Sequence, residues 1–299
     1  MATKLKKLAD QVIVVTGASS GIGLATAEEA VKRGAKVVLA ARSKQTLDAV
    51  AARLGANALA VECDVAEQGQ VEALARAAVA RFGRIDTWVN NAGTGMYGRL
   101  DESPDADARR VFDVNFWGVV YGCRAALPHL KGNGGALITV GSEVSDANVP
   151  LLGIYVASKH AVKGYVDTLR IEVENLDRSP VSVTLIQPTA VDTPFPQHAR
   201  NVMDKEPKLP TPQIDPADVA AAILTAAETP TRDKTVGAMS LVNTMMAKIA
   251  PGLGDTMAAK QADRMQYDEP PRNPDGALHR PSEETGVAGQ THGGGGKES

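Results

Sequence analysis

The chain has 299 residues, of which 43% are hydrophobic and 22% charged, and its formal net charge is −3. These values are typical of an ordinary globular protein, and without a basic excess the chain does not resemble a nucleic-acid-binding protein. Because the first ten residues lack the apolar core of a secretory signal and no run of about 18 apolar residues suggests a membrane span, we expect a cytoplasmic protein.

Short apolar runs alternate with helical patterns along the first two thirds of the chain. A strand is expected at residues 11–17, followed by a helix that stops near Gly34. Further strands are expected at residues 36–41, 58–65, 86–93, 135–142 and 181–188, with helical patterns between them. Near-continuous apolar strands separated by helices indicate a parallel sheet covered on both faces. We therefore predict an α/β fold, a doubly wound parallel sheet (Rossmann-like), with ligands bound beyond the carboxyl ends of the strands.

The last third of the chain breaks this alternation. Residues 194–216 contain six prolines, and so long a loop inside a domain is usually functional, so we interpret it as a lid. Residues 236–262 are rich in methionine and are expected to cap a substrate cleft, to pack as a final strand at 239–242, or to touch a membrane surface. Residues 263–299, rich in Pro, Gly, Glu and Ser, are predicted to be a flexible tail that follows a single domain at 1–262.

The two cysteines and five histidines indicate no disulfide and no metal site. Cys63 and Cys123 have no CxxC spacing, and no histidine pairs with a cysteine at ligand spacing. We expect two buried free thiols.

A glycine-rich segment, TGASSGIG at residues 16–23, joins the first strand to the first helix. Gly17 permits a tight turn, Gly21 lets the backbone approach a pyrophosphate, and Gly23 lets the helix pack on the strand. The helix N-terminus then meets the anion. The same letters match the G-x-S-x-G elbow of hydrolases, which would make Ser19 a nucleophile, but only one strand precedes it and no histidine is marked as its base.

Tyr155 and Lys159 lie four residues apart and therefore on the same face of a predicted helix. A phenol has a pKa of about 10, so it exchanges protons at neutral pH only if a positive charge stabilises the phenolate. Lys159 can supply that charge and lower the pKa of Tyr155, and the alternative is an exposed tyrosine on an amphipathic helix.

Seven motifs in order and in register resemble the short-chain dehydrogenase/reductase family: TGASSGIG at 16, DV at 64, NNAG at 90, Asn115 in DVNFWG, Ser142 in ITVGSEVS, YVASK at 155 and PTAVDTP at 188. The resemblance covers residues 11–193. It implies an oxidoreductase that interconverts a carbonyl and a secondary alcohol by hydride transfer, with the catalytic residues Asn115, Ser142, Tyr155 and Lys159. In this scheme Tyr155 is the general acid/base, Ser142 donates to the carbonyl oxygen, and the backbone carbonyl of Asn115 holds a water linked to Lys159.

The resemblance also implies a nicotinamide dinucleotide cofactor. NAD-preferring relatives often carry an acidic residue where this chain has Ala41, and Arg42 follows, so a 2′-phosphate is favoured and we expect NADP, with NAD as the alternative. The expected cofactor contacts are Gly17, Ser19, Ser20, Gly21, Ile22, Gly23, Arg42, Asp64, Val65, Asn91, Ala92, Gly93, Tyr155, Lys159, Pro188, Val191 and Thr193.

Three features are left open by the sequence. Thr189 replaces the glycine that commonly follows Pro188 in the family and cannot readily take positive φ, which leaves the turn and its nicotinamide contacts uncertain. Glu143 and Asp146 either meet a polar or cationic substrate group or face solvent. A catalytically silent dinucleotide-binding sensor or scaffold is the alternative function.

The expected partners are a small-molecule carbonyl or alcohol, with a preference for bulky apolar compounds, and further copies of the chain. The helical patterns around residues 108–130 and 155–175 carry apolar residues on more than one face, and relatives pair these helices across a two-fold axis. We therefore predict a homodimer or homotetramer.

Overall fold

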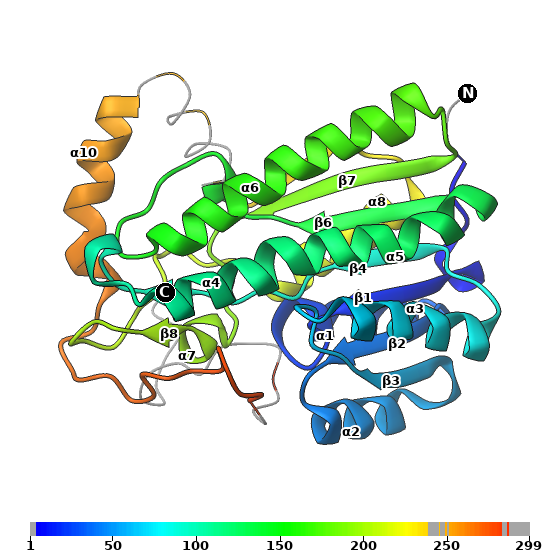
Figure 1. The fold of residues 1–299 in the computed structure, drawn as a ribbon, viewed down its shortest axis with the longest axis horizontal. Coiled ribbons are helices and arrows are strands. Elements are labelled where there is room, and N and C mark those ends of the chain that lie inside the picture. The colour runs from blue at the N-terminus through cyan, green and yellow to red at the C-terminus, as the bar shows by residue number, and fades with distance from the viewer. Residues whose placement is uncertain (1–3, 239–244, 246–248, 250, 283–285, 287–299) are drawn as a thin grey trace.

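A seven-stranded parallel sheet forms the centre of the molecule (Figure 1). The computed structural model describes residues 4–238, 245, 249, 251–282 and 286. The strand order is β3-β2-β1-β4-β6-β7-β9. The strands are β1 (Val12–Thr16), β2 (Lys36–Ala41), β3 (Ala58–Glu62), β4 (Thr87–Asn90), β6 (Gly135–Val140), β7 (Val181–Pro188) and β9 (Asp233–Val236). Because the strand order changes direction between β1 and β4, their carboxyl ends form the switch point at which ligands bind in such sheets.

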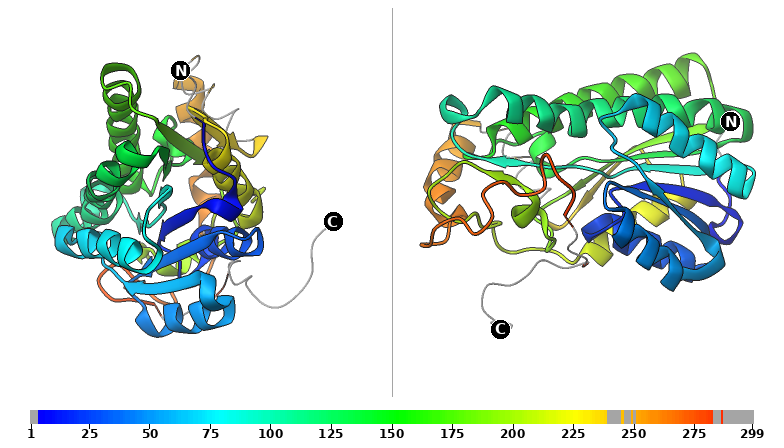
Figure 2. Two further views of the ribbon diagram at one scale, coloured as in Figure 1. Left: turned by 90° about the vertical axis from the view of Figure 1, so that its right-hand side faces the viewer. Right: turned by 60° about the horizontal axis from the view of Figure 1, so that its bottom comes forward.

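Helices cover both faces of this sheet (Figures 1 and 2). One apolar cluster packs α1 (Gly21–Lys32), α2 (Lys44–Leu54) and α8 (Pro216–Glu228) on one face. A second cluster packs α3 (Gln68–Phe82), α5 (Gly118–Asn133) and α6 (Gly153–Arg170) on the other. The predicted doubly wound fold is confirmed, because near-continuous apolar strands such as β1 are buried on both sides.

The expected single helix before residue 130 contains an irregular turn. α4 (Asp105–Phe112) continues into α5 through a π-helical turn at Asp113–Trp117. Single π-helical turns inside α-helices are frequent at functional sites. This turn carries Asn115, which is almost fully buried.

The loop expected to act as a lid has short elements of its own. Residues 194–216 include α7 (Phe195–His198) and β8 (Arg200–Asn201), and β8 pairs with β5 (Met96–Tyr97). This pairing fixes the first part of the loop beside the carboxyl end of β4.

The methionine-rich segment at 236–262 is described only in part. α10 (Pro251–Gln261) forms, and the exposed apolar side chains of this region include Ile249, Leu253 and Met257. The strand considered at residues 239–242 lies outside the described residues. Within the described part of the chain, no helix is long and apolar enough to cross a membrane.

Residues 265–282, the first part of the expected flexible tail, run back from α10 and pack on the domain (Figures 1 and 2). The Asn201 amide donates to Pro274 O at 2.8 Å and the Ala277 amide to His198 O at 2.8 Å. Leu278 is fully buried. The body of the structure therefore extends past the expected boundary at 262.

Candidate active site

The glycine-rich turn lies between the carboxyl end of β1 and the N-terminus of α1. Gly17 has φ +66°, and a Cβ added to it would lie 2.8 Å from Ala92 Cα. A Cβ on Gly23 would lie 2.2 Å from Gly17 O, so α1 packs against the turn only because this position is glycine. Asn91 Nδ2 donates to Thr16 O at 2.9 Å and ties the turn to the end of β4. The turn therefore presents the start of a helix at the switch point, where an anion is favoured.

Ser142, Tyr155 and Lys159 come together at the carboxyl end of β6. Ser142 follows β6, and it lines the same cavity as Tyr155, which lies in the first turn of α6. One turn later, Lys159 Nζ donates to Val140 O at 2.9 Å and lies 5.7 Å from the centroid of the Tyr155 ring. The four-residue spacing places the two side chains in one buried corner, as the sequence predicted.

Burial dominates the electrostatics of this corner. It raises the pKa of Tyr155 to about 12, with the Ser142 hydrogen bond acting to lower the pKa and the Glu143 carboxylate acting to raise it. Burial also lowers the pKa of Lys159 to about 8. We expected Lys159 to bring the tyrosine pKa down, whereas desolvation of the phenolate is the largest effect on that pKa and raises it.

The amide of Asn115 fastens the π-helical turn to the site. Its Nδ2 donates to Thr94 O and to Ser158 Oγ, each at 2.9 Å, and its Oδ1 accepts from the Thr94 amide at 2.9 Å. A Cβ added to Gly93 would lie 3.5 Å from Asn115 Oδ1 and 3.8 Å from Lys159 Nζ. Asn115, Gly93 and Lys159 are therefore close neighbours, as the predicted catalytic set requires.

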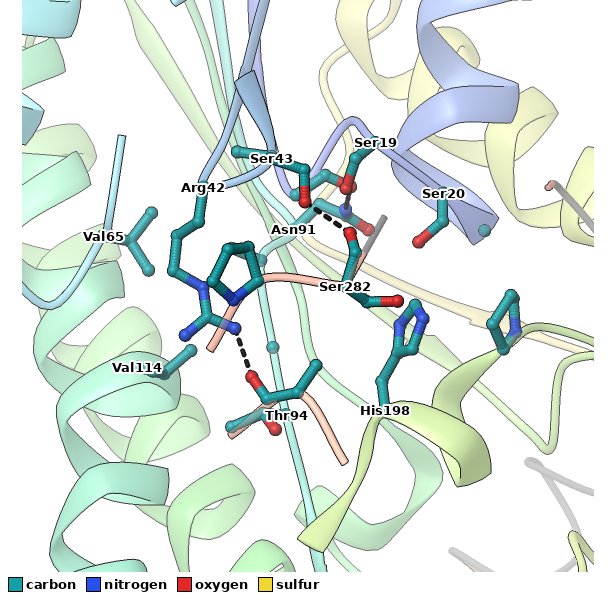
Figure 3. A pocket seen from close by; sticks show the side chains of 18 of the residues that line it. Ser19, Ser20, Arg42, Ser43, Val65, Asn91, Thr94, Val114, His198 and Ser282 are labelled. Atoms are coloured by element: carbon teal, nitrogen blue, oxygen red, sulfur yellow. Dashed lines mark hydrogen bonds between the residues drawn. The ribbon is translucent and has the colours of Figure 1, made fainter. Parts of the chain in front are cut away.

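The first of two adjoining cavities, which we call the cofactor cavity, extends from the glycine-rich turn past the ends of β2 and β3 (Figure 3). We call this turn, at residues 16–23, the phosphate turn. Its volume is about 200 Å³. It is lined by twelve of the expected cofactor residues: Gly17, Ser19, Ser20, Gly21, Ile22, Arg42, Asp64, Val65, Asn91, Ala92, Gly93 and Thr193. Gly23 lies behind the turn.

The second cavity, which we call the substrate cavity, has a volume of about 160 Å³ and contains the catalytic corner. Ser142, Tyr155, Lys159, Pro188 and Val191 line it. Its other walls are mainly apolar and include Val149, Leu152, Phe195, Leu209, Pro210 and Met265. Gly93 and Thr193 border both cavities, so a ligand can extend from one into the other.

The structure distinguishes the two acidic residues that follow Ser142. Glu143 is 8% exposed, lines the substrate cavity and accepts a hydrogen bond from Thr189 Oγ1 at 3.1 Å. Asp146 accepts from Gln187 Nε2 at 2.7 Å and does not line the cavity. Thr189 is not among the described residues with positive φ, so the turn after β7 forms without a glycine.

Several residues of the two cavities were missed by the sequence analysis. Phe195 lies against Tyr155, with ring centroids 5.2 Å apart, and Met265 lines the substrate cavity from the segment expected to be tail. Ala277, Pro281 and Ser282 line the cofactor cavity. Only Phe195 could have been suspected, because it lies in the proline-rich loop; the others follow α10 in a stretch whose composition suggested a tail.

Comparisons with known proteins agree with this geometry. The family model described as short chain dehydrogenase matches residues 11–204. The chain is 44% identical over 277 residues to an uncharacterized oxidoreductase, YxnA, of Bacillus subtilis, covering 91% of this chain and 78% of the relative. An alcohol dehydrogenase of the archaeon Thermococcus sibiricus complexed with 5-hydroxy-NADP has a TM-score of 0.66 at 31% identity, covering 76% of this chain and 94% of that one. A short chain dehydrogenase/reductase of Burkholderia phymatum in complex with NAD has a TM-score of 0.75 at 30% identity, covering 85% and 96%.

Proposed function

Because the chain belongs to the short-chain dehydrogenase/reductase family and is therefore an NAD(P)-dependent oxidoreductase, we propose that it interconverts a carbonyl and a secondary alcohol, with NADP as the preferred cofactor. The observation that carries the proposal is that Ser142, Tyr155 and Lys159 line one cavity, which adjoins the glycine-rich turn at residues 16–23. The bound dinucleotide supplies or accepts the hydride.

The proposed roles follow from where the side chains lie. During reduction, the Ser142 and Tyr155 hydroxyls both hydrogen-bond the carbonyl oxygen, and Tyr155 transfers its proton to that oxygen as negative charge develops there. Lys159, while charged, stabilises the phenolate that remains. Asn115 holds the π-helical turn against Thr94 and Ser158, which keeps its backbone available for a water beside Lys159.

The chain's own residues fit a dinucleotide phosphate. Positive φ at Gly17 and the close packing at Gly23 bring the helix N-terminus to the cofactor cavity. Arg42, at the end of β2, lines the same cavity without a carboxylate at position 41. This arrangement supports a 2′-phosphate on the adenosine ribose.

The substrate cavity supports an apolar carbonyl compound. Its walls are mainly aliphatic and aromatic, and Glu143 is the acidic side chain among its lining residues. With a volume of about 160 Å³, the cavity takes a bulky substrate only if Leu209 and Pro210 move away, as expected of the lid at 194–216.

The test is the turnover of NADPH with a panel of ketones and aldehydes by the wild type and by Tyr155→Phe. We expect the variant to lose roughly 10²–10⁴-fold in kcat, the range for general acid–base catalysis. The matched control is Tyr97→Phe, which removes a fully buried phenol from the apolar cluster against which Tyr155 packs. Equal rates in Tyr155→Phe and wild type contradict the proposed role, and tight NADPH binding without turnover of any carbonyl favours the sensor or scaffold.

A further inference from the structure

The end of the described chain enters the cofactor cavity. Ala277, Pro281 and Ser282 line it, and Figure 3 shows Ser282 in its middle, between Ser43 and His198. Gly286 pairs with Ser20 as a parallel bridge at the phosphate turn. We call residues 277–282 together with Gly286 the C-terminal segment.

The C-terminal segment accepts hydrogen bonds from the guanidinium of Arg42, the group that we propose binds the 2′-phosphate. Arg42 Nη1 donates to Leu278 O at 3.0 Å, and Nη2 donates to Ala277 O and, at 3.3 Å, to Arg280 O. A bidentate phosphate would need these same N–H groups. Backbone carbonyls therefore already accept hydrogen bonds from the guanidinium N–H groups of Arg42.

The segment also uses the donor at the phosphate turn. The amide of Gly21, the first residue of α1, donates to Gly286 O at 2.8 Å. Beside it, the Ser43 hydroxyl donates to Ser282 O. Carbonyl oxygens thus lie where the N-terminus of α1 would hold the pyrophosphate oxygens.

The space left beside the segment is small for a dinucleotide. The cofactor cavity measures about 200 Å³. Pockets that hold small-molecule ligands span roughly 300–1,000 Å³. The adenosine half of the cofactor and the C-terminal segment therefore compete for volume as well as for hydrogen-bond donors.

The segment has a part anchored by the buried side chain of Leu278 and a later part that forms hydrogen bonds with the protein. Leu278 is fully buried against Met96 and Val111, and the Ala277 amide donates to His198 O at 2.8 Å. Beyond Leu278, the contacts with the phosphate turn and with β2 are hydrogen bonds to main-chain carbonyls. The part from Arg280 onward can therefore leave the cavity while Leu278 stays in place. Its departure frees the Gly21 amide, the Ser43 hydroxyl and the Arg42 bond to Arg280 O, whereas the Arg42 bonds to Ala277 O and Leu278 O remain.

We propose that the C-terminal segment is an intramolecular competitor of the cofactor: it occupies the adenosine phosphate site and is displaced when the dinucleotide binds. The inference rests on the proposed cofactor site. Moving the segment out of the cavity costs the same free energy whichever ligand binds. The affinity of every ligand that needs the site is therefore lowered by the same factor. NADPH, NADH and adenosine 2′,5′-bisphosphate, which fills only the adenosine half, are all affected equally.

The first test compares two truncated chains. One ends at His279 and loses the whole part from Arg280 onward, including Pro281, Ser282 and Gly286, and the matched control ends at Gly286 and keeps the whole segment. We expect the shorter chain to bind all three ligands more tightly by the same factor, on the order of tenfold if the open form is about a tenth of the population, with the control equal to the full chain. Titration calorimetry gives the three dissociation constants.

Two results overturn the proposal in this test. Equal affinities in the two truncated chains show that the segment does not compete, and weaker binding in the shorter chain makes the segment a part of the cofactor site. If the full chain and both truncated chains bind no dinucleotide, the proposed cofactor site is wrong as well. This outcome differs from equal, measurable affinities, which contradict only the competition by the segment.

The second test locks the segment in place. Neighbouring strands lie about 4.8 Å apart, which is within the Cα separation that a disulfide spans, so Ser20→Cys with Gly286→Cys can be crosslinked across the bridge. We expect the oxidised protein to bind NADPH at least tenfold more weakly than the same protein after reduction, with Gly286→Cys alone as the control that is insensitive to oxidation. Full NADPH affinity in the crosslinked protein overturns the proposal.

Discussion

Tyr155 and Lys159 have pKa values shifted in opposite directions by the same burial, upward to about 12 and downward to about 8. The phenol is therefore the neutral, proton-carrying partner through the physiological range. The ammonium is the group whose charge changes near neutral pH. For the pair to work in reduction, Tyr155 must be protonated and Lys159 charged.

A pH profile of carbonyl reduction follows from these directions. Below about pH 8 both conditions hold, and above it Lys159 loses the charge that stabilises the phenolate, so we expect kcat/KM to be flat and then to fall with an apparent pKa near 8. Initial rates at saturating NADPH from pH 6 to 10 measure it, with circular dichroism at each pH to exclude unfolding. A profile that stays flat to pH 10 contradicts the assignment.

Glu143 gives a second prediction for the same tyrosine. Its carboxylate raises the pKa of Tyr155, so Glu143→Gln lowers that pKa while the amide oxygen can still accept from Thr189 Oγ1. Alcohol oxidation needs the phenolate, so its ascending limb is expected to move to lower pH and the rate at pH 9 to rise severalfold. Asp146→Asn is the control, because that carboxylate binds Gln187 away from the cavity, and an equal shift in both variants would rule out a specific effect of Glu143.

Arg42 governs the choice of cofactor if the proposal is right. A hydrogen bond to a charged group contributes roughly 1.5–3 kcal/mol, so Arg42→Gln is expected to lower kcat/KM for NADPH about ten- to hundredfold. NADH has no 2′-phosphate, so its kcat/KM serves as the internal control and is expected not to fall. A parallel loss with both cofactors would show that Arg42 supports the fold and not the phosphate.

At the scale of elements, the phosphate turn depends on one helix–strand contact. A Cβ at position 23 would lie 2.2 Å from Gly17 O, so Gly23→Ala must push α1 away from β1. Such overpacking costs about 1–3 kcal/mol of unfolding free energy, and NADPH binding should weaken with it. Gly69→Ala in α3 is the control, because nothing lies within 4 Å of its Cβ and the change should be neutral or stabilising. Urea denaturation of both variants is the measurement, and equal stabilities would contradict the packing role of Gly23.

The elements that could be predicted from the sequence are those whose burial requires a recognisable pattern of apolar residues. Strands covered on both faces, such as β1 and β2, need nearly continuous apolar runs, and both form where those runs occur. The edge strand β9 escaped notice, because Asp233 and Lys234 are exposed there and give no apolar run. The π-helical turn at Asp113–Trp117 likewise has a pattern that fits an ordinary helix.

The site was predictable to a similar extent, and for the same reason. Residues in local motifs, such as Tyr155 and Gly17, lie in the cavities because the turn or helix that carries them fixes their position. Met265 and Ser282 reach the cavities only through tertiary packing of a polar, proline-rich stretch. Long-range placement of that kind leaves no periodicity in a single sequence.

At the scale of the molecule, parallel strands bring distant residues to one edge of the sheet. The ends of β1, β2 and β4 form the cofactor cavity, and the ends of β6 and β7 form the substrate cavity beside it. The sheet's switch point joins the two, so a hydride can pass from one ligand to the other over a short distance. The opposite edge of the sheet carries neither cavity.

Four aromatic side chains gather on α5, on α6 and on the π-helical turn that precedes α5. The chain has four Phe, five Tyr and two Trp, and four of these rings lie together here. Ring centroids are 5.4 Å apart for Phe116 and Trp117, 5.9 Å for Trp117 and Tyr121, and 6.0 Å for Phe116 and Tyr165. Trp117 is 41% exposed. Aromatic side chains gathered on a surface are typical of interfaces.

We therefore expect the protein to be a homodimer or homotetramer held through this cluster. Burying Trp117 and its neighbours against a two-fold copy removes apolar area from water, and Trp117→Glu would place a charge in that dry contact and separate the subunits. Light scattering at micromolar concentration should give a multiple of 31.3 kDa for the wild type and a smaller assembly for the variant, with NADPH binding retained as evidence of folding. Leu253→Glu on α10 is the control, because that side chain is also exposed but lies outside the cluster. A wild-type species of 31.3 kDa would contradict the prediction, and dissociation by Leu253→Glu alone would move the interface to α10.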